Sequence, residues 1–308
     1  MRYLPDLTNT YWVDISHYSD KELLEFYDNP NNFYIKDCRN DLYNNNIPSN
    51  FLLSLTHWSY DIPSWFEKNF VKNDNTGNLR LLKNFSDWWT TPLVNSMDLE
   101  ENQIVRTQYS RVIWDCNRDI NDYSENGFLR KTDFWGIKLF NNIEWFRNKG
   151  EQHHIHYHTT IENKLLEIEK SWKKSFLFDI HDTWVLFMWE DTGMNHLDKE
   201  LFPLISLADV HGTSCDRDIL DYLILKIDNY LWIKAEINTP FKWWYITKSH
   251  WSDYRWILDN VSKRNVIQIE IGRFLYMKES TQELDEEKVR ILWEWLKRVI
   301  CDVVRKFS

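Results

Sequence analysis

The sequence predicts an α/β fold with a central sheet that is mixed or largely parallel, and three observations indicate it. From Phe51 onward, short apolar runs alternate with longer amphipathic ones, which is typical of chains that alternate strands and helices. Hydrophobic residues make up 43% and charged residues 27% of the 308 residues, which are the values of a globular domain. No segment rich in proline, glycine or serine divides the chain, so we expect one domain over residues 51–308.

Residues 1–50 have a different texture, because they are polar and rich in asparagine. We expect them to form an N-terminal extension packed on the domain, with a short helix near Lys21–Tyr27.

Apolar runs and apolar stripes predict the elements that follow. Six runs are expected to be strands: Phe51–Thr56, Arg111–Cys116, Ser175–Ile180, Phe202–Leu207, Leu231–Ile237 and Val266–Ile271. A first helical stripe comprises Ile161, Leu165, Ile168 and Trp172, and a second comprises Val289, Leu292, Leu296, Val299 and Val303. The second helix begins near two glutamates and ends near Arg305 and Lys306, as the helix dipole favours.

Composition excludes several classes of protein. The net charge of −10 disfavours a protein that tracks nucleic-acid phosphates. Only 7 residues are glycine, and neither GxGxxG nor GxxxxGK[ST] occurs, so a glycine-cradled nucleotide site is not expected. The four cysteines are far apart and fit a reducing compartment. No apolar run of membrane-spanning length and no signal-peptide pattern is present, so we expect a cytoplasmic protein.

Polar side chains stand where the expected strands end. His57 follows the first run, His181 follows Ser175–Ile180, and Glu270 lies inside the run that ends at Ile271. In open α/β sheets, ligands bind beyond the carboxyl ends of the strands. Two histidines and a carboxylate meeting there would be the ligand set of a catalytic zinc, with water in the open position.

Each of these residues also has a structural interpretation. A single histidine at a strand end is often a hydrogen-bonded core residue, and Glu270 has a possible ion-pair partner in Arg273. Asn117 and Arg118, after the run Arg111–Cys116, would on this interpretation only cap a turn. The histidine-rich segment 153–158 would share one face as a strand, but we favour a solvated loop that enters the following helix.

Taken together, short segments from Phe51 to Met277 resemble the N-formylglutamate amidohydrolase family of zinc hydrolases, which are distantly similar to zinc carboxypeptidases. The segments that carry the resemblance are His57, Ser86-Asp87-Trp88, Tyr109-Ser110-Arg111, Asp115-Cys116-Asn117-Arg118, Tyr157-His158, Phe178-Asp179-Ile180-His181, Gly212-Thr213-Ser214-Cys215, Phe241-Lys242, Ile246-Thr247-Lys248, Gln268-Ile269-Glu270 and Leu275-Tyr276-Met277. The sequence departs from the family pattern at Trp58-Ser59 and Trp243-Trp244, where a glycine is usual, and at His250, which is shifted. The resemblance implies a three-layer α/β/α architecture of the phosphorylase/hydrolase-like kind.

The resemblance also implies a zinc ion held by His57, Asp87 and His181. Asp61 is an alternative acidic ligand, because it lies four residues after His57. Asp179 lies two residues before His181 on the same strand face, where it would either orient a ligand or only fill the sheet edge.

The remaining implied roles concern catalysis and substrate. Glu270 would be the general base, and Arg111 would stabilise the developing oxyanion. Arg118 with Asn117 would bind a substrate carboxylate, because guanidinium offers it a planar fork. Three aromatic residues are expected to contact the substrate, although both tryptophans would alternatively be core residues: Trp243, Trp244 and Tyr276.

The function that the resemblance implies is zinc-dependent release of an N-acyl group from an amino acid such as N-formylglutamate, or from a related small carboxylate. Two alternatives remain open. One is a carboxypeptidase-like hydrolase of peptides or cell-wall fragments, and the other is a binding protein that kept the fold and lost turnover. No nucleic-acid or membrane partner is expected.

Overall fold

The computed structural model describes most of the chain from residue 47 onward. The described residues are 3–5, 12–14, 47–64, 66, 82, 85–87, 90–95, 97, 99–132, 138–141, 146–171, 174–183, 204–231, 233, 235–239, 245–251, 264–278 and 283–308. Before residue 47, β1 (Tyr3–Pro5) and β2 (Trp12–Asp14) pair as an antiparallel hairpin. The helix expected near Lys21–Tyr27 lies outside the described residues, and the packing of the N-terminal extension stays a prediction.

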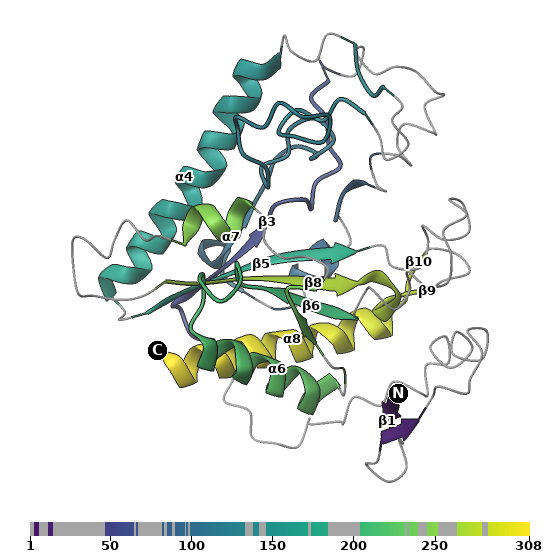
Figure 1. The fold of residues 1–308 in the computed structure, drawn as a ribbon, viewed down its shortest axis with the longest axis vertical. Helices are drawn as coiled ribbons and strands as arrows, with labels where there is room; N and C mark the ends of the chain where they lie inside the picture. The colour runs from purple at the N-terminus through teal and green to yellow at the C-terminus, as the bar shows by residue number, and fades with distance from the viewer. Residues whose placement is uncertain are drawn as a thin grey trace.

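A six-stranded sheet forms the centre of the molecule (Figure 1). Its strands are β3 (Phe51–Leu55), β4 (Ile104–Arg106), β5 (Ser175–Thr183), β6 (Ile205–Ala208), β7 (Glu236–Ile237) and β8 (Arg264–Gly272). The order is β4-β3-β5-β8-β6-β7, and every neighbouring pair is parallel except β6 and β8. The expected mixed, largely parallel sheet is therefore confirmed.

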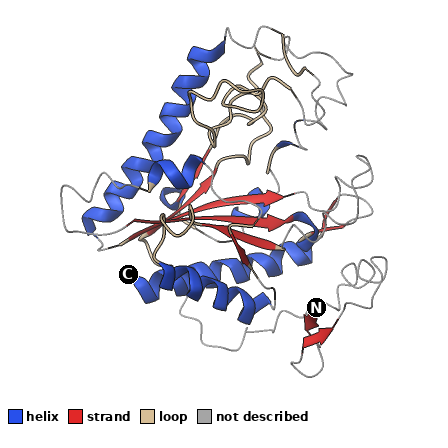
Figure 2. Cartoon of the chain, viewed as in Figure 1, coloured by secondary structure: helices blue, strands red, loops and turns tan. Residues whose placement is uncertain are grey.

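Helices cover both faces of this sheet, so the architecture has three layers (Figure 2). One face carries α4 (Arg147–Ser171) and α7 (Tyr245–His250). The other face carries α6 (Arg217–Leu231) and α8 (Glu286–Phe307), with the short α3 (Thr90–Asn95) beside them. Two short antiparallel strands, β9 (Met277–Lys278) and β10 (Glu283–Leu284), precede α8.

The C-terminal helix α8 forms where the apolar stripe predicts it. The carboxylate of Asp285 caps its first turn by accepting a hydrogen bond from the backbone N–H of Lys288. Glutamates in the first turn and basic residues in the last turn suit the helix dipole. Its buried stripe packs against strand residues such as Phe178 and Ile269, and this cluster is the main core of the protein.

Two expectations about local structure were wrong. Arg111–Cys116 is a series of turns with a single bridge between Trp114 and Leu129, not a strand. Its apolar residues pack in a separate cluster of their own, which explains the misleading pattern. The histidine-rich segment 153–158 is neither strand nor loop, because it lies within α4.

The run Leu231–Ile237 was only partly right. Leu231 ends α6, and the described part of that segment forms a strand only at Glu236–Ile237. Phe202 lies outside the described residues, and β6 begins at Ile205. Within the described residues, no helix is both long and apolar enough to span a bilayer.

Candidate metal centre

The carboxyl ends of three parallel strands bring the expected site residues together. His57 follows β3 within two residues, His181 lies near the end of β5, and Glu270 lies near the end of β8. His181 and Glu270 are direct partners in the register of β5 and β8, so their side chains leave the same face of the sheet. This face is the one that α4 and α7 cover.

Two imidazoles and one carboxylate converge at this edge. One donor atom from each of His57, Asp87 and His181 lies within 4.8 Å of the others, and all three residues are buried. The Nδ1 atom of His181 is 2.9 Å from Asp87 Oδ2, and the Nδ1 atom of His57 is 3.4 Å from it. Three such donors form the ligand set of a catalytic zinc, which keeps a fourth position for water or substrate.

A second carboxylate holds the outer nitrogen of each histidine. His57 Nε2 lies 2.8 Å from Asp115 Oδ1, and His181 Nε2 lies 2.8 Å from Asp179 Oδ2. Because an ionised carboxylate only accepts hydrogen bonds, each Nε2 carries the proton. When the ring is neutral, each Nδ1 then presents its lone pair toward Asp87. Metal-binding histidines almost always have such a partner, so the donor set fits a divalent cation.

Charges around the centre shift the pKa of the residues that would hold the metal. Burial disfavours the charged form of His181, but Asp179 and Asp87 raise its pKa well above the ordinary value. Burial likewise opposes ionisation of Asp87, yet hydrogen bonds from His181 and His57 lower its pKa. Both shifts favour a proton shared between His181 Nδ1 and Asp87 in the absence of a cation. A metal ion would take the place of this proton.

Arg111 donates a hydrogen bond to the lone pair of His57 Nδ1. Its Nη1 lies 2.9 Å from His57 Nδ1, and its Nη2 donates to Asp115 Oδ2 at 2.8 Å. A guanidinium only donates, so this contact independently identifies His57 Nδ1 as an acceptor. Burial opposes the charge of Asp115, but Arg111 and His57 hold its pKa well below the usual range.

Glu270 is buried beside His181 and has one polar neighbour on its own strand. Gln268 Nε2 donates to Glu270 Oε1 at 2.6 Å. Burial raises the pKa of Glu270 to about 8, since the low-dielectric surroundings disfavour its charge. A cation held by His181 and its neighbours would lower this pKa again, because positive charge favours the carboxylate.

Behind Asp87 lies a buried network centred on Asp182. The carboxylate of Asp182 accepts hydrogen bonds from Arg273 Nε and from the hydroxyl of Tyr276, the latter at 2.8 Å. Arg273 also donates to the carbonyl of Ser86 and lies 3.9 Å from Asp87 Oδ1. Burial raises the pKa of Asp182 to about 7, although Arg273 opposes this shift. The structure thus places Tyr276, expected at the substrate, in contact with Asp182.

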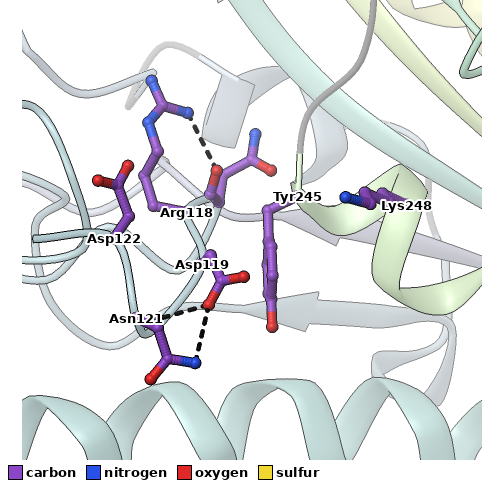
Figure 3. Close-up of a pocket in the computed structure, with 7 residues that line it drawn as sticks. Arg118, Asp119, Asn121, Asp122, Tyr245 and Lys248 are labelled. Atoms are coloured by element: carbon purple, nitrogen blue, oxygen red, sulfur yellow. Dashed lines mark hydrogen bonds between the residues drawn. The ribbon is translucent and has the colours of Figure 1, made fainter. Parts of the chain in front are cut away.

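A cavity of about 580 Å³ adjoins the centre through Asn117. Figure 3 shows its wall, in which one turn-rich segment faces two residues of α7. The lining residues are Asn117, Arg118, Asp119, Asn121, Asp122, Tyr245 and Lys248. Asn117 is buried; its Oδ1 accepts from the backbone N–H of Ile246, and its Nδ2 lies 3.4 Å from His181 Nε2. Arg118 donates to the carbonyls of Asn117 and Asn126.

The structure tests two further expectations from the sequence and leaves a third untested. Asp61 is exposed, and the metal-like cluster among the described residues contains Asp87 in its place. Arg273, the possible partner of Glu270, forms an ion pair with Asp182. Trp243 and Trp244 lie outside the described residues.

Several supporting residues were not recognised from the sequence. Asp115 had no separate role in the sequence interpretation, although it contacts His57 directly. Ser54 and Thr56 each donate a hydrogen bond to Asp179 Oδ1, at 2.6 and 3.0 Å. Their signal in the sequence was weak: polar residues at alternate positions on a buried strand face.

Comparisons with known proteins identify a family and two similar folds. The family model of N-formylglutamate amidohydrolase matches residues 49–277. Among solved structures, N-formylglutamate amidohydrolase from Ralstonia eutropha JMP134 superposes with a TM-score of 0.68 at 16% identity, covering 84% of this chain and 95% of its own. A gene product of Agrobacterium tumefaciens superposes with a TM-score of 0.60 at 14% identity, covering 86% and 94%. No curated protein matches significantly.

The two superpositions show the fold alone, because their identities are low. The family match extends over more than half of the sequence and includes every residue of the metal-like cluster. The chain therefore belongs to the N-formylglutamate amidohydrolase family.

Proposed function

We propose that this protein is a zinc-dependent amidohydrolase that removes a formyl-like acyl group from the nitrogen of an amino acid such as N-formylglutamate, or of a related small carboxylate. The observation that carries the proposal is the three-residue donor set, in which a carboxylate holds the outer nitrogen of each histidine. Glu270 lies next to this set on the adjacent strand. Membership of the family supports an amide bond as the target.

The metal site would consist of His57, Asp87 and His181. When bound, zinc lowers the pKa of water from 15.7 towards about 7 and polarises the carbonyl that is attacked. The chain contributes the fixed orientation of the two rings, because Asp115 and Asp179 hold their Nε2–H groups.

Two residues would act on the reacting atoms. Glu270 takes the proton from the attacking water and later delivers it to the leaving amine nitrogen. The bound cation would lower the pKa of Glu270, which burial raises in its absence, so that the carboxylate is ionised and can accept the proton. Arg111 lies beside His57 with a guanidinium that can donate to the oxyanion as it forms.

The cavity next to the centre would receive the amino-acid part of the substrate. Arg118 binds a carboxylate there, while Asn117 orders the wall between the cavity and His181. Tyr276, Trp243 and Trp244 stay predictions as substrate contacts. In this proposal the tryptophans would favour a flatter or more apolar acyl-amino acid than N-formylglutamate.

Metal analysis of the purified protein, combined with a hydrolysis screen, tests the proposal. The screen contains N-formyl, N-acetyl and longer N-acyl derivatives of acidic, apolar and basic amino acids, with dipeptides as a separate set. We expect about one zinc per chain and release of free amino acid from an N-acyl derivative. Cleavage confined to dipeptides would favour the carboxypeptidase-like alternative. Bound zinc without turnover of any compound would favour a binding protein.

A further inference from the structure

Two successive residues of α4, Tyr157 and His158, contact the residues that surround the two ligand histidines. Successive helical residues point about 100° apart, so neighbours in one turn can contact different elements. Tyr157 is buried against β3, and His158 contacts the turn segment after Trp114. Tyr157-His158, which resembles a Tyr-His motif of the family, thus contacts the surroundings of both ligand histidines. The proposed mechanism gives neither residue a role.

The Tyr157 hydroxyl begins a directed chain of hydrogen bonds. It lies 2.8 Å from Ser54 Oγ, and Ser54 donates its only hydroxyl proton to Asp179 Oδ1 at 2.6 Å. Tyr157 therefore donates its proton to Ser54 or to Thr56, whose Oγ1 lies 3.1 Å from the Tyr157 hydroxyl and which also donates to Asp179 Oδ1. The other oxygen of Asp179 lies 2.8 Å from His181 Nε2. Tyr157 thus supports the carboxylate that orients one histidine.

The His158 imidazole supports the other histidine through the backbone. Its Nε2 lies 2.9 Å from the carbonyl oxygen of Cys116, which can only accept, so Nε2 carries the proton. Burial lowers the pKa of His158 well below its ordinary value, and its neutral Nδ1 then accepts from His250 Nε2 at 2.8 Å. Cys116 directly follows Asp115, whose carboxylate holds His57 Nε2.

We propose that Tyr157 and His158 are positioning residues of the metal centre, Tyr157 acting on His181 through Asp179 and His158 acting on His57 through the segment of Asp115. This inference rests on the proposed metal site. In this inference, two adjacent residues of α4 fix the orientation of both ligand imidazoles toward the metal site. Neither residue contacts the donor atoms themselves.

The test removes each link and measures zinc affinity by competition with a chelator, together with the visible spectrum of the cobalt-substituted protein. Loss of a group that holds a ligand histidine directly typically weakens metal affinity by about 10–100-fold, and we expect the lower end of this range for Tyr157→Phe and His158→Gln, which act one residue further out. The cobalt spectrum should change and kcat should fall, while KM stays the same. Tyr230→Phe, which removes a hydroxyl bonded to Asp302, and His156→Gln, at an exposed position of α4, serve as matched controls.

Double variants separate positioning from general stability. If Tyr157 acts through Asp179, the Tyr157→Phe change should add little to Asp179→Asn but should add fully to Asp115→Asn. The reverse pattern is expected for His158→Gln. If Tyr157→Phe does not fold, the double change Ser54→Ala and Thr56→Val removes both hydroxyls that link Tyr157 to Asp179.

Wild-type affinity and spectrum in both single variants, or full additivity in every pair, would overturn the inference while leaving the proposed function intact. A wild-type protein that binds no zinc would overturn both.

Discussion

The two faces of the central sheet differ in what their side chains do, although the same strands supply both. On the α6 and α8 face, the alternate residues Phe176, Phe178 and Ile180 of β5 are apolar, and a charged residue, Asp182, follows them only near the end of the strand. On the α4 and α7 face, Ser175 and Leu177 of β5 are followed by Asp179 and His181.

A strand can thus serve a core and a chemical site at once, because its side chains alternate between faces. The polar face also changes along its length. It is apolar in its middle, at residues such as Leu177 and Val266, and it becomes polar toward the carboxyl ends of the strands. Residues that stabilise the core and residues of the candidate site are therefore adjacent in the sequence. We expect substitutions to change stability and activity separately.

The largest effect is expected from a substitution that prevents metal binding at the polar face. Asp87→Ala should abolish both zinc content and activity, because the remaining donors are two neutral imidazoles without a carboxylate. Asp61→Ala is the matched control, since Asp61 is exposed, and it should keep both. Metal analysis and an activity assay check the pair, and the opposite result would make Asp61 the ligand.

The next effect separates catalysis from metal binding. Glu270→Gln keeps the shape of the side chain but cannot accept a proton, so kcat should fall by a factor on the order of 10² to 10⁴. Zinc content and Tm should not decrease. A kcat close to that of the wild type would show that Glu270 is structural.

A substitution at Ile269, the residue before Glu270, tests whether the apolar face contributes to stability alone. Ile269→Ala leaves a cavity against α6 and α8 and should lower the free energy of unfolding by about 2–5 kcal/mol. Below the transition, kcat and zinc content should match the wild type. Denaturant unfolding and kinetics on the same preparation check this. A large kinetic defect in the folded variant would mean that the two faces are not separable.

The smallest expected effect concerns the cavity wall. Arg118→Ala removes a charged hydrogen bond to the substrate carboxylate, worth about 1.5–3 kcal/mol, and should raise KM by roughly 10- to 100-fold. Arg217→Ala, which only breaks an exposed pair with Asp221 on α6, should leave KM unchanged. Steady-state kinetics with a carboxylate substrate measure both, and equal KM values would remove Arg118 from substrate binding.

The sequence predicted those parts of the fold whose pattern comes from burial in the sheet. β3 and β8 are buried along their whole lengths and β5 is buried in all but its last residue, and their apolar runs identified them. Segment 153–158 was misread because its buried helical stripe contains histidines. His154 and Tyr157 continue the stripe of Ile161 and Leu165, and the His154 ring is bonded to a backbone carbonyl of another segment. Nothing local reveals such a partner.

The residues of the candidate site were likewise predictable only where a local sequence pattern identified them. His57, His181 and Glu270 followed from their positions at strand ends, whereas Asp87 came from the family resemblance. The support given by Asp115 depends on tertiary contacts between segments that are far apart in the sequence. Its role therefore required the structure.

The side-chain amide of Asn50, just before β3, donates to Ser308 Oγ at 2.8 Å, so the first core strand lies beside the final turn of α8 across 258 residues of sequence. Contacts between residues so far apart in the sequence raise the contact order of the fold, and a high contact order slows folding. The strand that leads to His57 is covered on its apolar face by the last helix, so the position of this residue depends on a segment more than 200 residues away in the sequence.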